Sequence, residues 1–346
     1  MKVLRFLLFP FAILYDFVTR IRNFFFDTGV FSHTSFKIPL IVVGNLSVGG
    51  TGKTPQIEYL IRLLRDNYKT AVLSRGYGRK TKGFVLLNDT HSATDVGDEP
   101  LQYFKKFKNV DIAVDADRVA GVKKLIEKNT PGVMLLDDAF QHRKVKGSFY
   151  VLLTKFDDLF VDDFLLPTGG LRESRQGAKR AHIILVTKCP TNLSKEAQDS
   201  IKQKLLQFHK KVFFTRISYA DALLGSMEVA TSKLKNFEVL LITGIANPVP
   251  LVNYLKSLNV QFQHLEFADH HHFSDKEIER IEKKFKEMPS SKIILTTEKD
   301  YVRLRDKIQE ISYLPIETTF LNNENEEFNT LINSHLKEIY KSKFLL

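Results

Sequence analysis

Continuous apolar runs alternate with helical stretches over much of the chain. The strand candidates are residues 38–44, 70–74, 110–114, 132–137, 148–153 and 182–187. The helical stretches between and after them are residues 54–65, 117–128 and 194–209. Apolar runs that lack an alternation with polar residues are typical of strands covered on both faces, as in a parallel sheet. The pattern therefore predicts an α/β fold with a doubly wound, mostly parallel sheet.

A second and shorter set of elements follows. Residues 238–243 and 292–297 are buried-strand candidates, and residues 247–258 and 275–286 have helical patterns. The stretch 211–219 ends the first domain or begins the connection, and the patterning weakens after it. The expected organisation is an N-terminal helix over 1–30, a larger α/β domain over 31–219, a linker over 220–235 and a smaller α/β domain over 236–346.

The N-terminal segment combines a wholly apolar run with an amphipathic helix. The run 6–15 is shorter than the ~20 residues needed to cross a bilayer, and no cleavage site of a signal peptide follows it. Polar residues then recur at intervals of four, three and four: Asp16, Arg20, Asn23 and Asp27. This helix packs on its own domain core or lies in a membrane surface. The unbroken apolar run favours the membrane surface, as a peripheral or monotopic anchor.

The composition narrows the class of protein. The chain has 346 residues, of which 43% are hydrophobic and 26% charged, so a globular core is expected and disorder is not. The formal net charge of +11 favours an anionic partner, whether nucleic acid, a phosphorylated metabolite or an anionic lipid surface. Cys189 is the only cysteine, so no disulfide can form within the chain and a reducing, intracellular compartment is expected.

A glycine-rich loop follows the first strand candidate and leads into a helix. Glycines allow backbone N–H groups to converge on phosphate oxygens at the helix N-terminus. Lys53 would reach the β- and γ-phosphates of a nucleotide, and the Thr54 hydroxyl would bind Mg²⁺. Position 47, a glycine in the strict P-loop pattern, is Ser47. The predicted nucleotide-binding residues are Gly49, Gly50, Thr51, Gly52, Lys53 and Thr54.

Two carboxylates end the strand candidate at 132–137. Asp137 and Asp138 occupy the position at which P-loop proteins present an acid to magnesium. An aspartate at the end of a strand often only forms a turn. Together with the glycine-rich loop, however, the pair becomes a candidate for binding Mg²⁺, directly or through water.

Several spaced motifs make the chain resemble the tetraacyldisaccharide 4'-kinase family of lipid A biosynthesis. They are GNLSVGGTGKTP (44–55), LSRGYGR (73–79), GDEP (97–100), DADR (115–118), LLDDAFQHR (135–143), LLPTGGLRE (165–173), VTK (186–188), FADHHH (267–272) and TTEKD (296–300). Ser47 belongs to this family's version of the loop. The resemblance implies a kinase that uses ATP and Mg²⁺ to phosphorylate the 4'-hydroxyl of tetraacyldisaccharide 1-phosphate, giving lipid IVA. It also implies a location at the cytoplasmic face of the inner membrane, with a lipid substrate, an anionic membrane surface, no nucleic acid and no obligate protein partner.

The resemblance also implies roles for individual residues. Asp98 matches the base that accepts the proton of the sugar hydroxyl, and His270 matches its partner, although three consecutive histidines leave the register within 270–272 open. Lys53 is expected to take part in catalysis. The acidic residues near the metal and phosphates would be Glu99, Asp137 and Asp138. The polar residues of the substrate cleft would be Arg118, Gln141, His142, Arg172 and Glu173.

Simpler interpretations remain for some of these residues. Asp98 could cap a helix that starts beside it, because aspartate is a good N-cap. Adjacent histidines such as 270–272 cannot all converge on one ion, so no zinc site is expected.

Two other classes of function remain open. The first is a P-loop ATPase or GTPase that acts as a switch at the membrane. A guanine-specific switch needs an aspartate at the position of Pro190, after Thr187 and Lys188, which disfavours GTP and leaves ATP open. The second is a nucleic-acid-binding module, which the scattered distribution of basic residues does not favour.

Overall fold

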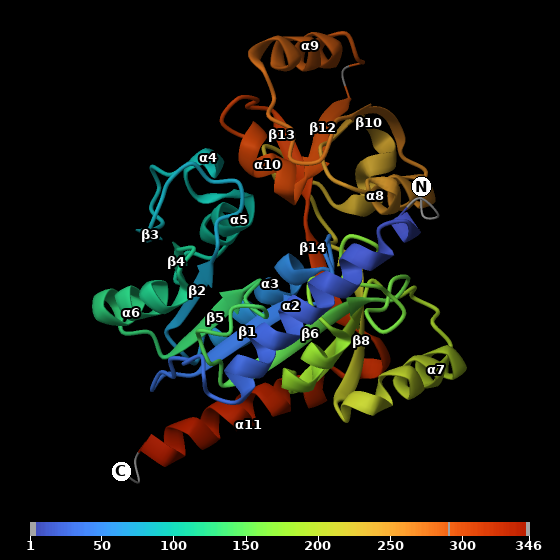
Figure 1. Cartoon of the computed structure of the whole chain (residues 1–346). Helices are drawn as coiled ribbons and strands as arrows, with labels where there is room; N and C mark the ends of the chain where they lie inside the picture. The colour runs from blue at the N-terminus through green and yellow to red at the C-terminus, as the bar shows by residue number, and fades with distance from the viewer. Residues whose placement is uncertain (1–4, 290, 344–346) are drawn as a thin grey trace.

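The computed structural model describes residues 5–289 and 291–343, and within them nine strands form a larger sheet (Figure 1). Its order is β14-β8-β7-β6-β1-β5-β2-β4-β3. All neighbouring pairs are parallel except β3 with β4 and β14 with β8. The strands are β1 (Leu40–Asn45), β2 (Thr70–Ser74), β3 (Val85–Leu86), β4 (Asp111–Val114), β5 (Val133–Asp137), β6 (Phe149–Lys155), β7 (Ile183–Thr187), β8 (Lys211–Tyr219) and β14 (Ile316–Phe320).

Both faces of this sheet are buried, which explains the continuous apolar runs. Along β1, Ile41 and Val43 belong to one apolar core, whereas Leu40 and Val42 belong to another. Side chains of α3 (Lys53–Leu64) and α11 (Asn325–Lys343) contribute to the first core, and those of α6 (Arg118–Asn129) contribute to the second. The predicted doubly wound, mostly parallel α/β architecture is confirmed.

A smaller sheet holds five strands of the described chain, in the order β11-β10-β12-β13-β9. They are β9 (Leu224–Gly225), β10 (Glu238–Thr243), β11 (Gln261–Glu266), β12 (Lys292–Thr297) and β13 (Ile311–Leu314), and only β9 runs antiparallel to its neighbour. The helices around it are α8 (Val249–Ser257), α9 (Asp275–Lys286) and α10 (Glu298–Leu304). The remaining helices are α2 (Phe9–Asp27), α4 (Ala93–Val96), α5 (Asp98–Lys106) and α7 (Lys195–Leu205).

The structure divides the chain differently from the sequence at two places. Residues 316–343 were expected in the smaller domain, but β14 pairs with β8 and the α11 side chains Phe328 and Leu336 lie in a core of the larger sheet. Residues 220–235 were expected to be a linker, but β9 joins the smaller sheet and Leu223 is buried in its core. Short or amphipathic elements such as these carry little pattern of their own. The expected ends at residues 1 and 346 lie outside the described residues.

Two short connections and one helix pair join the two sheets. The backbone N–H of Ala220 donates to the carbonyl of Pro315 at 3.0 Å, so the chain leaves and returns to the larger sheet at the same place. Beside them α10 packs against α5 (Figure 1). At one end of this helix pair Lys106 forms ion pairs with Glu58 at 2.6 Å and with Glu298 at 2.7 Å. All three side chains are largely buried, so each charge depends on its partners.

The Glu298 carboxyl makes thermal stability depend on pH. Burial, and then the charge of Glu58, raise its pKa to about 7, against the opposing charges of Lys106 and Arg62. The folded state therefore retains a proton that the unfolded chain releases above its ordinary value of 4.5, and stability falls as pH rises through that window. We expect Glu298→Gln to reduce the fall in melting temperature between pH 5 and pH 7.5 by about 2 °C. The exposed Glu310→Gln is the control, and an equal fall in Glu298→Gln and the native protein would contradict the assignment.

Candidate active site

The glycine-rich loop connects β1 to α3 as a phosphate-binding loop requires. Gly49 and Gly52 adopt φ values of +99° and +83°, which favour glycine because a Cβ is strained there. Lys53 begins α3, and its Nζ lies 3.2 Å from Asn45 Oδ1 and 3.6 Å from Asp138 Oδ1. The ammonium group is thus held between the start of the loop and the acidic end of β5.

The serine that departs from the strict P-loop pattern has a structural reason. Ser47 forms an antiparallel bridge with Leu171, so its backbone is extended and needs no glycine. At the other end of the loop, the Thr187 hydroxyl donates to the Thr51 carbonyl at 2.8 Å. The loop is therefore attached at two points to segments that follow later in the chain. The other predicted loop residues, Gly50 and Thr54, lie in the same segment and in the first turn of α3.

The two carboxyls at the end of β5 differ in environment. Burial, and then the charge of Asp138, raise the pKa of Asp137 to about 6, and the Ser74 hydroxyl donates to its Oδ2 at 3.2 Å. Burial would also raise the pKa of Asp138, but Lys53 and Arg172 hold it below the ordinary value. Arg172 donates to Asp138 Oδ1 at 2.9 Å. Asp138 therefore faces two cations of the protein, whereas the buried carboxyl of Asp137 contacts the hydroxyls of Ser74 and Tyr103.

The predicted metal-binding residues gather around Tyr103. Its hydroxyl lies 3.5 Å from Asp137 Oδ2 and hydrogen-bonds to Thr54. Glu99 is close enough for its charge to raise the pKa values of both Asp137 and Tyr103. Over residues 5–289 and 291–343, no three His, Cys, Asp or Glu side chains are arranged to hold a metal ion alone. Magnesium commonly takes one or two carboxylates and completes its shell with substrate phosphates and water, so this donor set fits it.

Asp98 and His270 meet across the two sheets. Asp98 starts α5, and its Oδ2 lies 2.9 Å from His270 Nδ1. His271 Nε2 instead lies 3.0 Å from Glu277 Oε1, and His272 is exposed. The structure thus distinguishes the three histidines by position, and only the first of them contacts Asp98.

The environment of Asp98 is that of a buried carboxylate and not of a helix cap. Gly97 is the N-cap of α5, and no side chain caps this helix. Burial would raise the pKa of Asp98, but the hydrogen bonds and charge of Arg303, followed by those of His270, hold it below its ordinary value. Asp98 is therefore ionised and is held by Arg303 and His270. Both belong to the smaller unit, which consists of the five-stranded sheet and the helices around it.

Two of the predicted substrate residues are less accessible than expected. The Arg118 side chain is almost fully buried and donates to the main-chain oxygens of Asp115 and, at 3.2 Å, Asp137. Burial lowers its pKa to about 10. Burial, and then the charges of Arg118 and Arg75, lower the pKa of the half-buried His142 to about 4. Arg118 supports the end of β5 from behind, and His142 stays neutral beside it.

Glu173 and Gln141 join the site to the N-terminal helix. Glu173 is 2% exposed and accepts two hydrogen bonds from Arg180, at 2.7 and 2.8 Å. Gln141 Nε2 donates to Glu173 Oε1 at 3.1 Å, and Asn23 of α2 donates to Glu173 Oε2 at the same distance. Arg172 is the predicted substrate residue that contacts Asp138, which also faces Lys53. Glu173 instead anchors α2.

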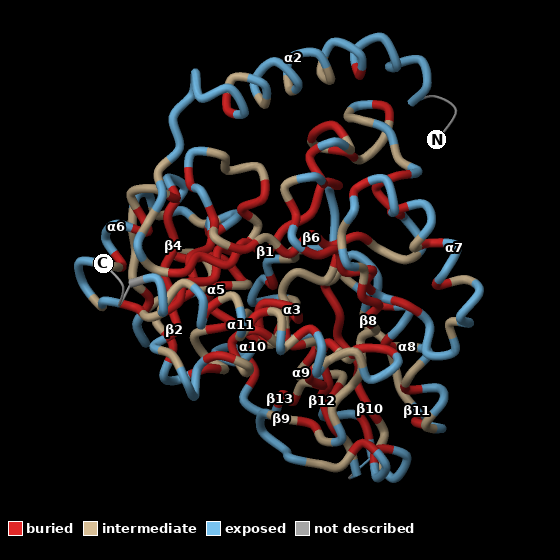
Figure 2. The backbone as a smooth tube through the Cα atoms, turned by 90° about the horizontal axis from the view of Figure 1, so that it is seen from below, coloured by how far each residue is buried: buried red, intermediate tan, exposed pale blue. Residues whose placement is uncertain are grey.

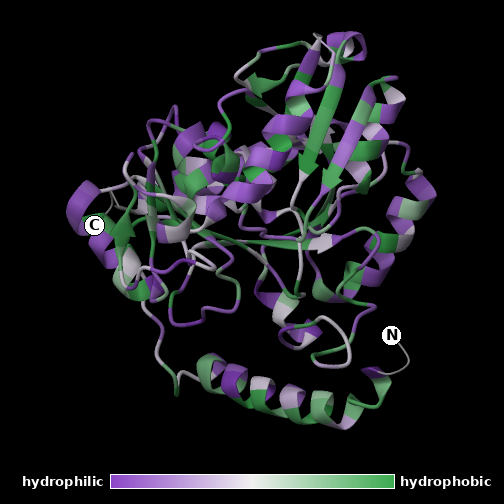
Figure 3. Cartoon of the chain, turned by 90° about the horizontal axis from the view of Figure 1, so that it is seen from above, coloured by the Kyte–Doolittle hydropathy of each residue, from purple (hydrophilic) through white to green (hydrophobic). Residues whose placement is uncertain are grey.

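Helix α2 turns its polar side toward the protein and its apolar side outward. Tyr15 donates to the Arg172 carbonyl at 2.8 Å, and Arg143 pairs with Asp27 at 2.5 Å. The outward residues form an exposed apolar face: Phe6, Leu7, Leu8, Phe9, Phe11, Ile13, Leu14, Phe17, Val18, Ile21 and Phe24. Figure 2 shows α2 beside the body of the molecule and largely exposed, and Figure 3 shows hydrophobic residues along most of its length. In the described part of the chain, no helix has the length and apolar character needed to span a bilayer.

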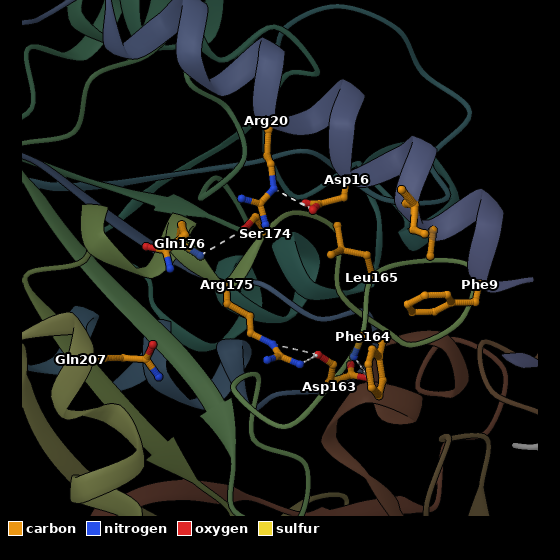
Figure 4. Close-up of a pocket in the computed structure, with 12 residues that line it drawn as sticks. Phe9, Asp16, Arg20, Asp163, Phe164, Leu165, Ser174, Arg175, Gln176 and Gln207 are labelled. Carbon is orange, nitrogen blue, oxygen red and sulfur yellow. Dashed lines mark hydrogen bonds and ion pairs between the residues drawn. The ribbon is translucent and has the colours of Figure 1, made fainter.

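A cleft of about 370 Å³ separates α2 from the loop that carries Arg172 (Figure 4). Phe9 lies on the helix side and Phe164 on the loop side, with ring centroids 6.3 Å apart. The polar lining of the cleft includes the Arg20–Asp16 ion pair, at 2.7 Å, and Arg175, which donates to the Asp163 carbonyl beside Phe164. The cleft therefore continues the apolar face of α2 inward.

Sequence reasoning missed three side chains that the structure places in the site. Asn45 is fully buried and accepts hydrogen bonds from Lys53 and Arg172. Arg303 contacts both oxygens of Asp98, and Lys299 lies 3.0 Å from His270 Nε2. A polar residue in an otherwise apolar strand was a signal for Asn45, and the motif at 296–300 was a signal for Lys299. Nothing local distinguished Arg303 from the other basic residues.

Comparisons with known proteins identify the family of this chain. The family model described as tetraacyldisaccharide-1-P 4'-kinase matches residues 4–337. A tetraacyldisaccharide 4'-kinase of Flavobacterium johnsoniae is 53% identical and covers 98% of this chain and 99% of the relative. One of Bacteroides thetaiotaomicron is 43% identical, over 96% of this chain and 93% of the relative. The crystal structure of the "apo" form of LpxK from Aquifex aeolicus in complex with ATP superposes with a TM-score of 0.78 at 31% identity and covers 96% of this chain and 99% of that one.

These matches extend over nearly the whole chain and include both sheets and α2. The chain therefore belongs to the tetraacyldisaccharide-1-P 4'-kinase family and is a kinase of lipid A biosynthesis.

Proposed function

We propose that this protein transfers the γ-phosphate of ATP to the 4'-hydroxyl of tetraacyldisaccharide 1-phosphate, with Mg²⁺, and forms lipid IVA. The observation that carries the proposal is the meeting of two parts: a phosphate-binding loop with Lys53 facing Asp138, and an ionised Asp98 paired with His270. The first part would hold the phosphoryl donor, and the second would receive the proton of an acceptor hydroxyl. The names of the relatives and the ATP bound in the structure from Aquifex aeolicus support the choice of substrates.

The loop residues bind and orient the donor in this proposal. The backbone N–H groups of the segment 49–54 would surround the phosphates at the positive end of α3. Lys53 would neutralise charge on the transferred phosphoryl group. Arg172 lies close to Lys53, because both side chains contact Asp138. Thr54 and Asp137 would hold Mg²⁺, with Glu99 and Asp138 acting directly or through water, and the ion would add positive charge at the phosphates.

Asp98 acts on the acceptor. Phosphoryl transfer requires mainly positioning and charge neutralisation, with a carboxylate to orient the attacking hydroxyl and take its proton. Asp98 is ionised, its neighbour His270 can share the proton, and both sit where the two sheets face each other. Movement of the smaller unit would open and close this site, so closure over substrate is part of the proposal.

The lipid substrate explains the outward apolar face of α2. We propose that this face lies in the cytoplasmic surface of the inner membrane, peripherally, and that the cleft beneath it offers space for an apolar chain. Anionic lipid would complement the net charge of +11. The partners in this proposal are the lipid and the membrane, without nucleic acid or an obligate protein partner.

A transfer assay tests the function directly. Purified protein in detergent micelles receives γ-labelled ATP, Mg²⁺ and tetraacyldisaccharide 1-phosphate, and label is followed into lipid. A parallel reaction contains lipid IVA, whose 4'-position already carries phosphate. Label in the first lipid and not in the second supports the proposal. Equal labelling of both would refute the 4'-hydroxyl as acceptor, and ATP hydrolysis without any lipid product would favour a P-loop switch protein.

Membrane binding has its own expected result. Phe11 and Phe17 are each 61% exposed on α2, and burial of one such ring in the interface contributes about 1–2 kcal/mol. We expect the double variant Phe11→Glu/Phe17→Glu to bind anionic lipid vesicles at least about 50-fold more weakly in a sedimentation assay. Tyr77→Glu, at an aromatic side chain that is 74% exposed outside α2, is the control. Equal loss in both variants would show that α2 is not the anchor.

A further inference from the structure

Helix α10 presents two basic side chains to the Asp98–His270 pair. Lys299 and Arg303 are four residues apart, so they lie on the same face of the helix. Neither touches the phosphate-binding loop in any described contact. The helix is fixed at its start, where the Asp300 N–H donates to the Thr297 hydroxyl at 3.1 Å.

Arg303 holds both oxygens of the Asp98 carboxylate. Its Nε donates to Oδ1 at 2.7 Å, and a second guanidinium nitrogen donates to Oδ2. A third nitrogen donates to the His271 carbonyl at 3.3 Å. The Arg303 side chain is 7% exposed. A two-point contact of this kind fixes the plane of a carboxylate as well as its position.

The ring of His270 has a cationic donor beside each of its nitrogens. Lys299 Nζ lies 3.0 Å from His270 Nε2 and also donates to Asp269 at 3.1 Å. An Arg303 guanidinium nitrogen lies 2.9 Å from His270 Nδ1, and the same Nδ1 lies 2.9 Å from Asp98 Oδ2. Arg303 therefore contacts both members of the Asp98–His270 pair.

These contacts leave one direction open on Asp98. A carboxylate has about two acceptor positions on each oxygen. Oδ2 is contacted by His270 Nδ1 and by Arg303, whereas Oδ1 is contacted by Arg303 alone among the described residues. The remaining position belongs to Oδ1, so that oxygen is the one that can accept an outside hydroxyl.

We propose that Arg303 is a positioning residue for phosphoryl transfer. It turns the carboxylate of Asp98 so that Oδ1 receives the acceptor hydroxyl while Oδ2 faces His270. Arg303 belongs to the smaller unit and Asp98 to the larger one, so this contact is made only when α10 lies on α5. The inference rests on the proposed function, because it assigns Asp98 to the acceptor.

Kinetics with variants at position 303 test this role. We expect Arg303→Ala to lower kcat about 100-fold while KM for ATP changes less than about threefold, since the donor binds elsewhere. Added guanidinium should restore part of kcat, and Arg303→Lys should retain more than Arg303→Ala because it keeps one charged donor. Arg305→Ala, on the exposed continuation of the helix, is the control. Full activity of Arg303→Ala, or a loss that neither guanidinium nor lysine reduces, would overturn the role.

The native protein in the same assay separates this inference from the proposed function. Absence of lipid phosphorylation by the native protein would refute the proposed function. Native activity together with an unaffected Arg303→Ala variant would overturn only the role of Arg303.

Discussion

Asp98→Asn is expected to lower the rate of phosphate transfer to lipid by about 10²–10⁴-fold, because the amide cannot take the proton of the acceptor hydroxyl. The amide also brings an N–H₂ group against the donors of Arg303 and His270, so the acceptor position on the side chain is disturbed. KM for ATP should change little, since the phosphate-binding loop lies on other elements. The measurement is steady-state transfer at saturating ATP, with the exposed Asp66→Asn as the matched control.

A double variant makes this result more specific. If Asp98 and His270 act as a unit, Asp98→Asn combined with His270→Ala should lose little more activity than Asp98→Asn alone. Losses that multiply would separate the two residues and show that the 2.9 Å contact is not used in catalysis. Retention of near-normal activity by Asp98→Asn would remove the carboxylate from the mechanism altogether.

The larger sheet was predictable because its strands are buried on both faces. Runs such as 38–44 and 182–187 have no polar residue in their interior to confuse the pattern, and the structure places β1 and β7 there. Strand β14 was not predicted, since only Thr318 and Phe320 of IETTF are buried and the other three positions are half-buried or exposed, at the edge of the sheet. Helix α11 was missed for a related reason, because only one side of it packs on the core and polar residues occupy the rest.

Part of the site could likewise be predicted from residues that are close in sequence, whereas the rest depends on contacts between residues far apart in sequence. The loop at 49–54 and the carboxylates at 137–138 are consecutive in sequence, so their chemistry could be inferred from spacing. The contact between Asp98 and Arg303 joins residues 205 positions apart, and no local pattern specifies it. Glu173 shows the converse: a charged residue in a recognisable motif proves to be buried among Arg180, Gln141 and Asn23, where it anchors α2.

Lys53→Met is expected to lower transfer by about 10²–10³-fold, because it removes the positive charge from the transferring phosphate while nearly keeping the length of the side chain. In the structure this ammonium group also opposes Asp138 at 3.6 Å, so its loss leaves two adjacent carboxylates facing the phosphates with less compensation. We therefore expect weaker ATP binding as well as a lower kcat, which distinguishes this variant from Asp98→Asn. Lys53→Arg should restore part of the binding but not the rate, since a planar guanidinium does not fit the position held by Asn45. Lys195→Met, on the exposed first turn of α7, is the control, and activity of Lys53→Met within tenfold of the native protein would show that the loop does not act as a phosphate-binding loop.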